Sequence, residues 1–195
     1  MSPKTLFSQL LNNSLEERVD KSMWKYFSSF KNKKLSLDEN DYENIYVISD
    51  IHGHIDIFEK ALEKLILNKN DLFVIAGDSC DRGEGTSKVY KKTFQLIEDG
   101  YKIIHLLGNH EEMLLNYFLN NTGYYTWTQN GGAETLKSYK NKDDLLKKHL
   151  AFMKSMFLYI ETENYIIVHA GIDCGSMKRL GILELKSKKT LYINN

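Results

Sequence analysis

Short apolar runs, each followed at once by polar residues, constrain the fold of this 195-residue chain more than any other feature. These strand candidates are Ile45–Ser49, Leu72–Ala76, Ile103–Leu107 and Tyr165–Val168. The stretches between them carry apolar residues at three- and four-residue spacing, as helices packed on a sheet do. These helix candidates are Ile55–Leu67, Thr86–Glu98, Glu111–Leu119 and Asp143–Ser155. Strands that alternate with helices predict an α/β fold with a mostly parallel inner sheet.

The chain divides into two regions that differ in their pattern of polar and apolar residues. Residues 1–44 are polar and aromatic, and Ser14–Glu17 has the form of a capping box before the amphipathic run Val19–Phe30. We therefore expect a helical N-terminal extension over residues 1–44, followed by one domain over residues 45–195. Within that domain, Phe157–Glu161 and Tyr165–Val168 flank a short turn and predict a β-hairpin.

The composition excludes several classes of protein. The 26 Lys and Arg residues balance 26 Asp and Glu residues, so nothing indicates a nucleic acid or a membrane surface as the partner. No stretch approaches the ~18 consecutive apolar residues of a membrane span, and we expect a cytoplasmic protein. Cys80 and Cys174 lie far apart and form no CxxC pair, which argues against a disulfide framework and a structural zinc site.

Polar side chains follow every predicted strand. They are Asp50 and His52, Asp78 and Asp81, Asn109 and His110, and finally His169. Open α/β sheets gather ligand groups at the carboxyl ends of their strands, so we expect these side chains to lie together.

Some of these residues have the chemistry of a two-metal site. Asp50 and His52 are two residues apart at a strand end, where an extended backbone points both to one side, and together they can hold one ion. The Asp78 carboxylate can bridge two cations ~3.5–4 Å apart, and Asn109 and His169 add ligands to the second ion. Oxygen and nitrogen ligands together suit manganese, iron or zinc better than calcium or magnesium. A bridging water whose pKa is lowered by two cations would then be the nucleophile.

The neighbouring residues suit the rest of a displacement at phosphorus. His110 follows Asn109 directly, so it can give a proton to the leaving alkoxide. Asp81 is placed to orient that imidazole and keep it protonated. Arg82 presents a planar fork that matches phosphate oxygens.

Each cluster alone has a simpler interpretation, because Asp-x-His and Asp-Arg-Gly also occur as ordinary turn chemistry. Several clusters in the same order, each after a strand, favour a metal site instead. Among the other candidates, His54 is expected at a helix start, His105 in the core, and His149 exposed on a lysine-rich helix. Cys80 is expected to be a packed thiol rather than a redox-sensitive one.

Four sequence blocks resemble the signature motifs of the phosphoprotein phosphatase branch of the calcineurin-like metallophosphoesterases. They are Ser49-Asp50-Ile51-His52-Gly53, Gly77-Asp78-Ser79-Cys80-Asp81-Arg82-Gly83, Gly108-Asn109-His110-Glu111 and Val168-His169-Ala170-Gly171. The segment Trp127–Gly132, with Thr135, Leu136 and Tyr139 after it, is similar to the Trp-x-x-Asn-Gly-Gly region of bacterial and phage members. The resemblance extends over roughly residues 45–173.

The resemblance implies a β-sandwich of two mixed sheets flanked by helices, with a site for two divalent metal ions at one edge. Manganese is the expected metal, with iron or zinc as alternatives. By motif match, the resemblance implies that Asp50, His52 and Asp78 are ligands of one ion, and that Asp78, Asn109 and His169 are ligands of the other. It also implies that His110 is the acid, that Asp81 is the carboxylate that orients it, and that Arg82 contacts the phosphate.

The chain also departs from the family pattern. Ser49 stands where glycine is usual, and Cys80 replaces an aliphatic residue. Family members carry a further Gly-His motif after the His-Ala-Gly block, whereas residues 172–195 contain no histidine. We therefore expect a divergent or truncated tail over residues 174–195, an incomplete second sheet and a weaker second metal site.

The expected function is metal-dependent hydrolysis of phosphate monoesters, with phosphoserine or phosphothreonine in proteins as the substrate. Two alternatives remain open. One is a dinucleoside polyphosphate hydrolase, because symmetrical diadenosine tetraphosphatases resemble the same motifs. The other is a non-catalytic remnant that lacks the last metal-binding histidine. A phosphoprotein or a small phosphorylated molecule is the expected partner, and the oligomeric state is left open.

Overall fold

The structure is a computed structural model that describes residues 34–170 and 189–192. Its strands are β1 (Lys34–Ser36), β2 (Ile45–Ile48), β3 (Leu72–Ile75), β4 (Lys102–His105), β5 (Tyr159–Glu161), β6 (Tyr165–Val168) and β7 (Lys189–Tyr192). Its helices are α3 (Ile55–Leu65), α4 (Thr86–Glu98), α5 (Asn109–Asn120), α6 (Tyr124–Trp127), α7 (Ala133–Ser138) and α8 (Asp143–Ser155). Two short helical turns complete them, η1 (Glu39–Asp41) and η2 (Thr128–Gly132).

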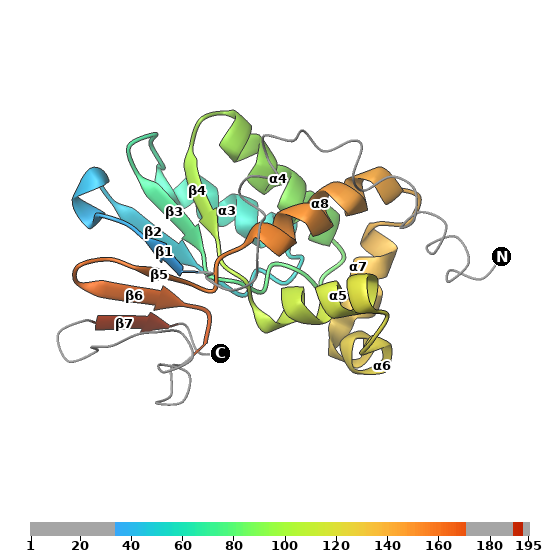
Figure 1. Ribbon diagram of the computed structural model, residues 1–195. Coiled ribbons are helices and arrows are strands. Elements are labelled where there is room, and N and C mark those ends of the chain that lie inside the picture. Colours follow the sequence, from blue (N-terminus) through green and yellow to red (C-terminus); the bar gives the residue numbers. More distant parts are fainter. Residues whose placement is uncertain (1–33, 171–188, 193–195) are drawn as a thin grey trace. The chain divides into compact units, whose positions relative to one another are not determined.

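The described strands form two sheets (Figure 1). The first has the order β2-β3-β4 and is parallel throughout, where the family resemblance implied a mixed sheet. The second has the order β1-β5-β6-β7, and only its β5–β6 pair is antiparallel. The predicted α/β class, the parallel inner sheet and the β5–β6 hairpin are therefore confirmed.

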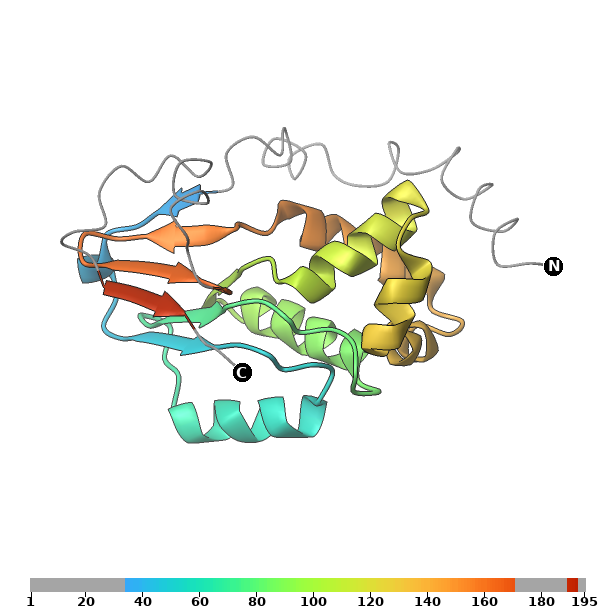
Figure 2. The same cartoon turned by 90° about the horizontal axis from the view of Figure 1, so that it is seen from below.

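Strand β3 lies at the centre of the core, and all of its residues are buried. Its side chains alternate between two apolar layers, as the two-residue period of a strand requires. Val74 packs with Ile160 and Ile167 of the second sheet, while Phe73 faces the other way and stacks on Phe58 of α3, with ring centroids 6.3 Å apart. The two sheets thus form a sandwich with helices on the outer face of β2-β3-β4, and Figure 2 shows α3 on that face.

Helices α5 to α8 lie together beyond the carboxyl end of the β2-β3-β4 sheet (Figure 1). His149 of α8 is fully buried there, so the expectation that it is exposed is wrong. The reason is its position on the helix, because His149 shares the buried face with Leu146, Leu150 and Met153 at three- and four-residue spacing.

Most predicted elements agree closely with the observed ones. The bounds of α4, α8 and β6 are those expected from the sequence. Helix α5 begins two residues before its predicted start, at Asn109, because Gly108 caps it and Glu111 accepts the Gly108 N–H. Helix α3 ends at Leu65 because Ile66 adopts a left-handed backbone with φ of 45°.

The ends of the chain were less predictable. The expected helix at residues 19–30 lies outside the described residues. Strand β1, within the proposed helical extension, pairs instead with β5, so the helical interpretation does not hold for Lys34–Ser36. Strand β7 lies in the tail expected to be divergent, and it pairs in parallel with β6.

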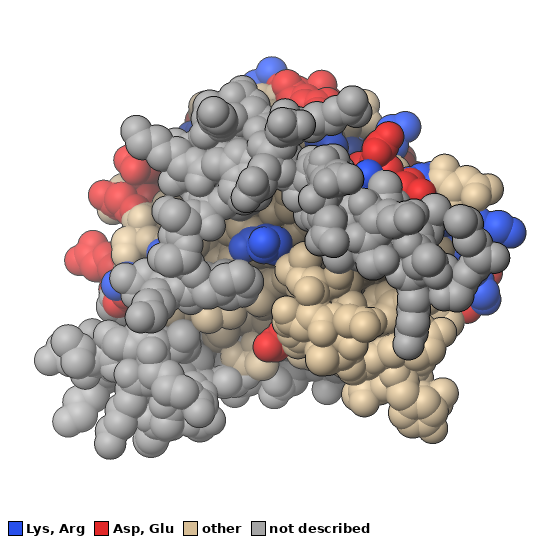
Figure 3. Space-filling view, turned by 45° about the vertical axis from the view of Figure 1, so that its right-hand side comes forward, with Lys and Arg blue, Asp and Glu red and all other residues tan. Residues whose placement is uncertain are grey.

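The described surface carries charges of both signs. On the face seen in Figure 3, acidic and basic side chains lie at the upper right and at the left edge, a basic group lies near the centre, and the described atoms at the lower right are largely uncharged. Within residues 34–170 and 189–192, none of the helices has the length and apolar character needed to cross a membrane.

Candidate metal centre and its surroundings

The parallel strands β2, β3 and β4 end at the same edge of their sheet (Figure 1). The loops after β2 and β3 supply Asp50 and Asp78, and the start of α5, just after β4, supplies Asn109. His169 follows β6 in the second sheet. In the structure, each predicted site residue has a polar side-chain atom within 3.9 Å of a polar side-chain atom of another site residue, so that all of them form one cluster.

Several of these residues have an unusual backbone conformation. The site residues with positive φ are Asp50 (54°), His52 (46°), Asp78 (54°), Asp81 (69°) and Arg82 (61°). A left-handed backbone costs an ordinary residue about 1–2 kcal/mol, and such strain tends to cluster at functional sites. The strained loops are held by backbone hydrogen bonds, including those from His52 N–H to Asp78 C=O and from Asp50 N–H to Gly77 C=O.

The first half of the centre contains His52, Asp50 and Asp78. The Nε2 atom of His52 lies 3.6 Å from Oδ1 of Asp50 and 3.8 Å from Oδ2 of Asp78. Its Nδ1 atom donates to the carbonyl of Cys80 at 2.9 Å, which fixes the ring so that Nε2 faces the carboxylates. That Nε2 is buried and has no hydrogen-bond partner within the described residues. A buried nitrogen that faces two carboxylates beyond hydrogen-bond distance fits a metal ion between them.

The second half contains His169, Asn109 and again Asp78. The Nε2 atom of His169 lies 3.1 Å from Oδ1 of Asn109 and 3.3 Å from Oδ2 of Asp78. Its Nδ1 donates to the carbonyl of Ala76 at 2.8 Å, as Nδ1 of His52 donates to Cys80. Both histidines therefore have the backbone support that is typical of metal-bound imidazoles.

The charges at this place attract a cation. Burial lowers the pKa of His169, but the hydrogen bond and negative charge of Asp78 raise it more, to about 9. Burial raises the pKa of Asp78, yet the hydrogen bonds from His169 and from the His110 N–H bring it below its ordinary value. Positive charge is thus favoured at Nε2 of His169, where either a proton or a metal ion can supply it.

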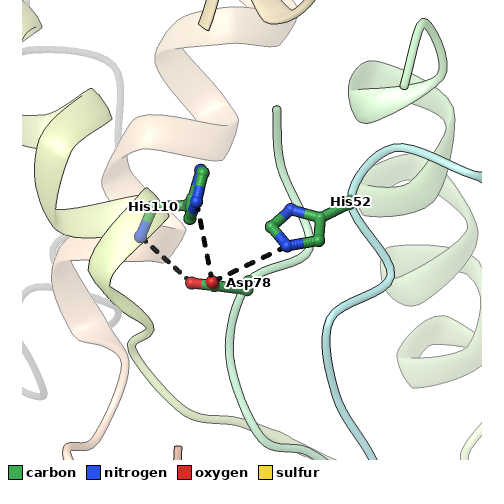
Figure 4. Close-up of side chains that lie close together, drawn as sticks. All are labelled: His52, Asp78 and His110. Atoms are coloured by element: carbon green, nitrogen blue, oxygen red, sulfur yellow. Dashed lines mark hydrogen bonds and ion pairs between the residues drawn. The ribbon is translucent and has the colours of Figure 1, made fainter. Parts of the chain in front are cut away.

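His110 lies close enough to belong to the same cluster. Ligand atoms of His52, Asp78 and His110 all lie within 4.8 Å of one another (Figure 4). The Nε2 atom of His110 is 3.9 Å from Oδ2 of Asp78, about as far as that of His52. Its Nδ1, however, contacts the Asp81 carboxylate at 2.8 Å, and Nη2 of Arg82 lies 3.4 Å from its Nε2.

The centre lies at the surface although its inner atoms are buried. Asp78, His52 and His110 are buried, whereas Asn109 and Arg82 are exposed. The side of the centre on which Asn109 and Arg82 lie is therefore exposed to solvent.

Sequence reasoning missed Glu111, Trp127 and Thr135. The buried Glu111 carboxylate accepts from the backbone N–H groups of Asp78 and Ser79. Trp127 and Thr135 donate to the Asp81 carboxylate. All three belong to the quoted family motifs, so their positions could be seen in the sequence, but hydrogen bonds over 32 to 54 residues could not.

The remaining candidates lie largely where expected. Exposed His54 precedes α3, and buried His105 has its Nε2 2.9 Å from the Ser79 hydroxyl. Cys80 is fully buried, and burial together with the nearby carboxylates raises the pKa of its thiol well above the usual value. A buried, protonated thiol is a packing group, as the sequence indicated.

Comparison with known sequences agrees with the family resemblance of the motifs. Residues 43–190 match the model of the family described as calcineurin-like phosphoesterase. The match continues past residue 173, where the motif resemblance ends.

Three relatives show how far the similarity extends. Serine/threonine-protein phosphatase 2 of Salmonella typhimurium is 32% identical over 137 residues, which cover 66% of this chain and 59% of that protein. The asymmetrical bis(5'-nucleosyl)-tetraphosphatase PrpE of Oceanobacillus iheyensis is 32% identical over 146 residues, with 66% and 56% covered. Shewanella-like protein phosphatase 1 of Plasmodium berghei is 29% identical over 91% of this chain and 51% of its own length. The chain thus spans about half to three fifths of these relatives.

A solved structure agrees on the fold. A serine/threonine phosphatase of Saccharomyces cerevisiae superposes with a TM-score of 0.54 at 20% identity, covering 89% of this chain and 55% of that one. On the family match and the shared fold, this chain belongs to the calcineurin-like phosphoesterase family.

Proposed function

We propose that this protein is a metal-dependent phosphomonoesterase that acts on phosphoserine or phosphothreonine in proteins. The observation that supports this most is one side-chain group at a solvent-facing edge. It combines a metal-ligand set around Asp78 with the His110–Asp81 pair and the exposed Arg82. Such a combination suits attack on a phosphate ester in which the leaving oxygen needs a proton.

Two divalent ions fit the ligand set. Asp50, His52 and Asp78 would hold one ion, and Asp78, Asn109 and His169 the other. Oxygen and nitrogen ligands of this kind favour manganese, with iron or zinc as alternatives. When bound, the ions would activate a water for attack and neutralise charge on the phosphate.

The chain's own residues would orient the substrate and supply a proton. Arg82 would bind phosphate oxygens through its planar guanidinium. Its Nη2 lies 3.4 Å from Nε2 of His110, so a phosphate held there would place its leaving oxygen beside the imidazole. His110 would carry a proton at Nε2 for that oxygen while Asp81 holds the proton at Nδ1.

Hydrolysis of dinucleoside polyphosphates is the second candidate. A relative named as a bis(5'-nucleosyl)-tetraphosphatase is as similar to this chain, at 32% identity, as the relative named as a protein phosphatase. A non-catalytic remnant is the third, and the joint placement of the predicted ligands, acid and phosphate contact argues against it.

A side-by-side assay separates these functions. The purified chain is incubated with manganese and either a phosphoserine peptide or diadenosine tetraphosphate, with Asp78→Asn as the inactive control. The proposal expects the peptide to be dephosphorylated at the higher kcat/KM. Hydrolysis of the tetraphosphate alone would favour the second candidate, and hydrolysis of neither by a metal-loaded chain would favour the remnant.

A further inference from the structure

The Asp81 carboxylate is fully buried, and two further side chains donate to it besides His110. The indole Nε1 of Trp127 lies 3.0 Å from Oδ1 and 2.9 Å from Oδ2, so one N–H spans both oxygens. The hydroxyl of Thr135 donates to Oδ1 at 2.7 Å and accepts from the Asp81 N–H at 2.9 Å. Oδ2 also contacts Nδ1 of His110, at 2.8 Å.

These donors come from a distant part of the chain. Trp127 ends α6, 46 residues after Asp81, and Thr135 lies in α7, 54 residues after it. The indole is held in place because its ring stacks on Tyr117 at 5.0 Å, and a Cβ atom at Gly132 would come within 2.4 Å of it. Packing on both sides of the ring therefore helps to fix the direction of the Trp127 N–H.

A carboxylate can rotate about its terminal bond, so its plane must be fixed if one oxygen is to face His110. Donors that reach both oxygens of Asp81 fix that plane, and the left-handed backbone of Asp81 (φ 69°) is held by the same Thr135 hydroxyl. We propose that Trp127 and Thr135 are positioning residues, which hold the Asp81 carboxylate in the orientation that keeps His110 directed at the metal centre. This inference rests on the proposed function, because it assigns a task within that reaction.

Two substitutions remove the donors, and only Thr135→Val is isosteric, because Trp127→Phe also removes part of a buried ring. Trp127→Phe keeps an aromatic ring and loses the N–H, and Thr135→Val keeps the branched shape and loses the hydroxyl. Loss of a supporting partner of this kind typically costs about 10–100-fold. We expect that loss in kcat for phenyl phosphate, whose leaving group needs a proton, and a much smaller loss for p-nitrophenyl phosphate. The KM values should change little.

If Trp127 and Thr135 had a purely structural role, their loss would lower kcat equally for both esters. Tyr139→Phe is the matched control, because it removes a buried hydroxyl that lies 2.6 Å from Nδ1 of His149, away from Asp81. It should lower the melting temperature as the test variants do, without a leaving-group dependence. In a His110→Ala background, Trp127→Phe should cause no further loss of kcat, because its effect passes through His110.

A readout that needs no activity keeps this inference separate from the proposed function. The His110 Nδ1 proton should give a downfield NMR signal that is absent from His110→Ala. Trp127→Phe and Thr135→Val should shift or broaden that signal, even if the wild type proves inactive on every ester. An unchanged signal, an equal loss on both esters, or a further loss in the His110→Ala background would overturn the inference. If Trp127→Phe does not fold, Thr135→Val decides between these results.

Discussion

The Glu111 carboxylate accepts the backbone N–H of Asp78 at 2.8 Å, across 33 residues. It also accepts from Ser79 N–H, Gly108 N–H and the Tyr90 hydroxyl. The residue that follows His110 in the chain therefore holds the loop that carries the central carboxylate of the metal centre. A buried charge so fully paired with donors has a structural task, and its loss would affect the site and the fold together.

Replacement of that carboxylate should be costly. Glu111→Gln places an amide NH₂ against backbone donors and leaves at least one of them unpaired, so we expect a loss of roughly 2–4 kcal/mol in unfolding free energy. Metal affinity should fall as well, because the Asp78 loop loses its anchor. Urea unfolding and metal titration measure the two effects. Glu112→Gln, a change at the exposed neighbour, is the control, and an equal effect there would refute the assignment.

The sequence predicted the residues of the candidate site better than the hydrogen bonds that support them. Asp50, Asp78 and Asn109 could be placed because each follows a strand whose apolar pattern is clear, and parallel strand ends meet at one edge. The bonds of Trp127 to Asp81 and of Glu111 to Asp78 join distant segments, and nothing in local periodicity encodes such pairs. His149 shows a different limit of prediction from sequence, because three nearby lysines suggested an exposed position although the residue lies on an apolar helix face.

Strand β7, near the C-terminal end of the sequence, illustrates a third limit of prediction from sequence. Strand β7 has polar residues at its start and is too short for a clear two-residue pattern. Its place beside β6 depends on pairing with a strand already in the sheet. Tertiary context of this kind cannot be recovered from propensity alone.

Removal of the proposed acid should affect substrates unequally. His110→Ala is expected to lower turnover of a phosphoserine peptide by about 10²–10⁴, the usual contribution of a positioned general acid. The loss should be much smaller for p-nitrophenyl phosphate, because p-nitrophenolate leaves without a proton. Steady-state kinetics with both substrates test this, and an equal loss on each would argue against the acid role.

Gly131 tests the placement of Arg82. A Cβ atom there would lie 2.5 Å from the Arg82 backbone nitrogen, whose N–H donates to the Gly131 carbonyl. Gly131→Ala should therefore displace Arg82 and raise the KM for phosphate esters. Gly123→Ala is a matched control, since Gly123 also has positive φ but open space around its Cβ position. It should cost only about 1 kcal/mol of backbone strain and leave KM unchanged. Equal KM values for the two variants would contradict the assigned contact.

The buried histidine in α8 predicts a pH dependence of stability. Burial, aided by the charge of Lys148, lowers the pKa of His149 from 6.5 to about 4. The unfolded chain therefore takes up this proton first as the pH falls, and stability is lost between about pH 6.5 and 4. From this residue alone we expect roughly 2 kcal/mol less unfolding free energy at pH 5 than at pH 7. His149→Gln, which cannot titrate, should show a correspondingly smaller change, and an identical pH profile would exclude the effect.

Dependence on metal is the central claim, and one measurement tests it most directly. The purified chain is treated exhaustively with a chelator, assayed on p-nitrophenyl phosphate, and assayed again after addition of manganese, with metal content determined by elemental analysis. We predict that chelation abolishes hydrolysis, that manganese restores it, and that Asp78→Asn neither retains the metal nor recovers activity, because Asp78 faces both halves of the centre. Full activity of the metal-free chain would contradict the account.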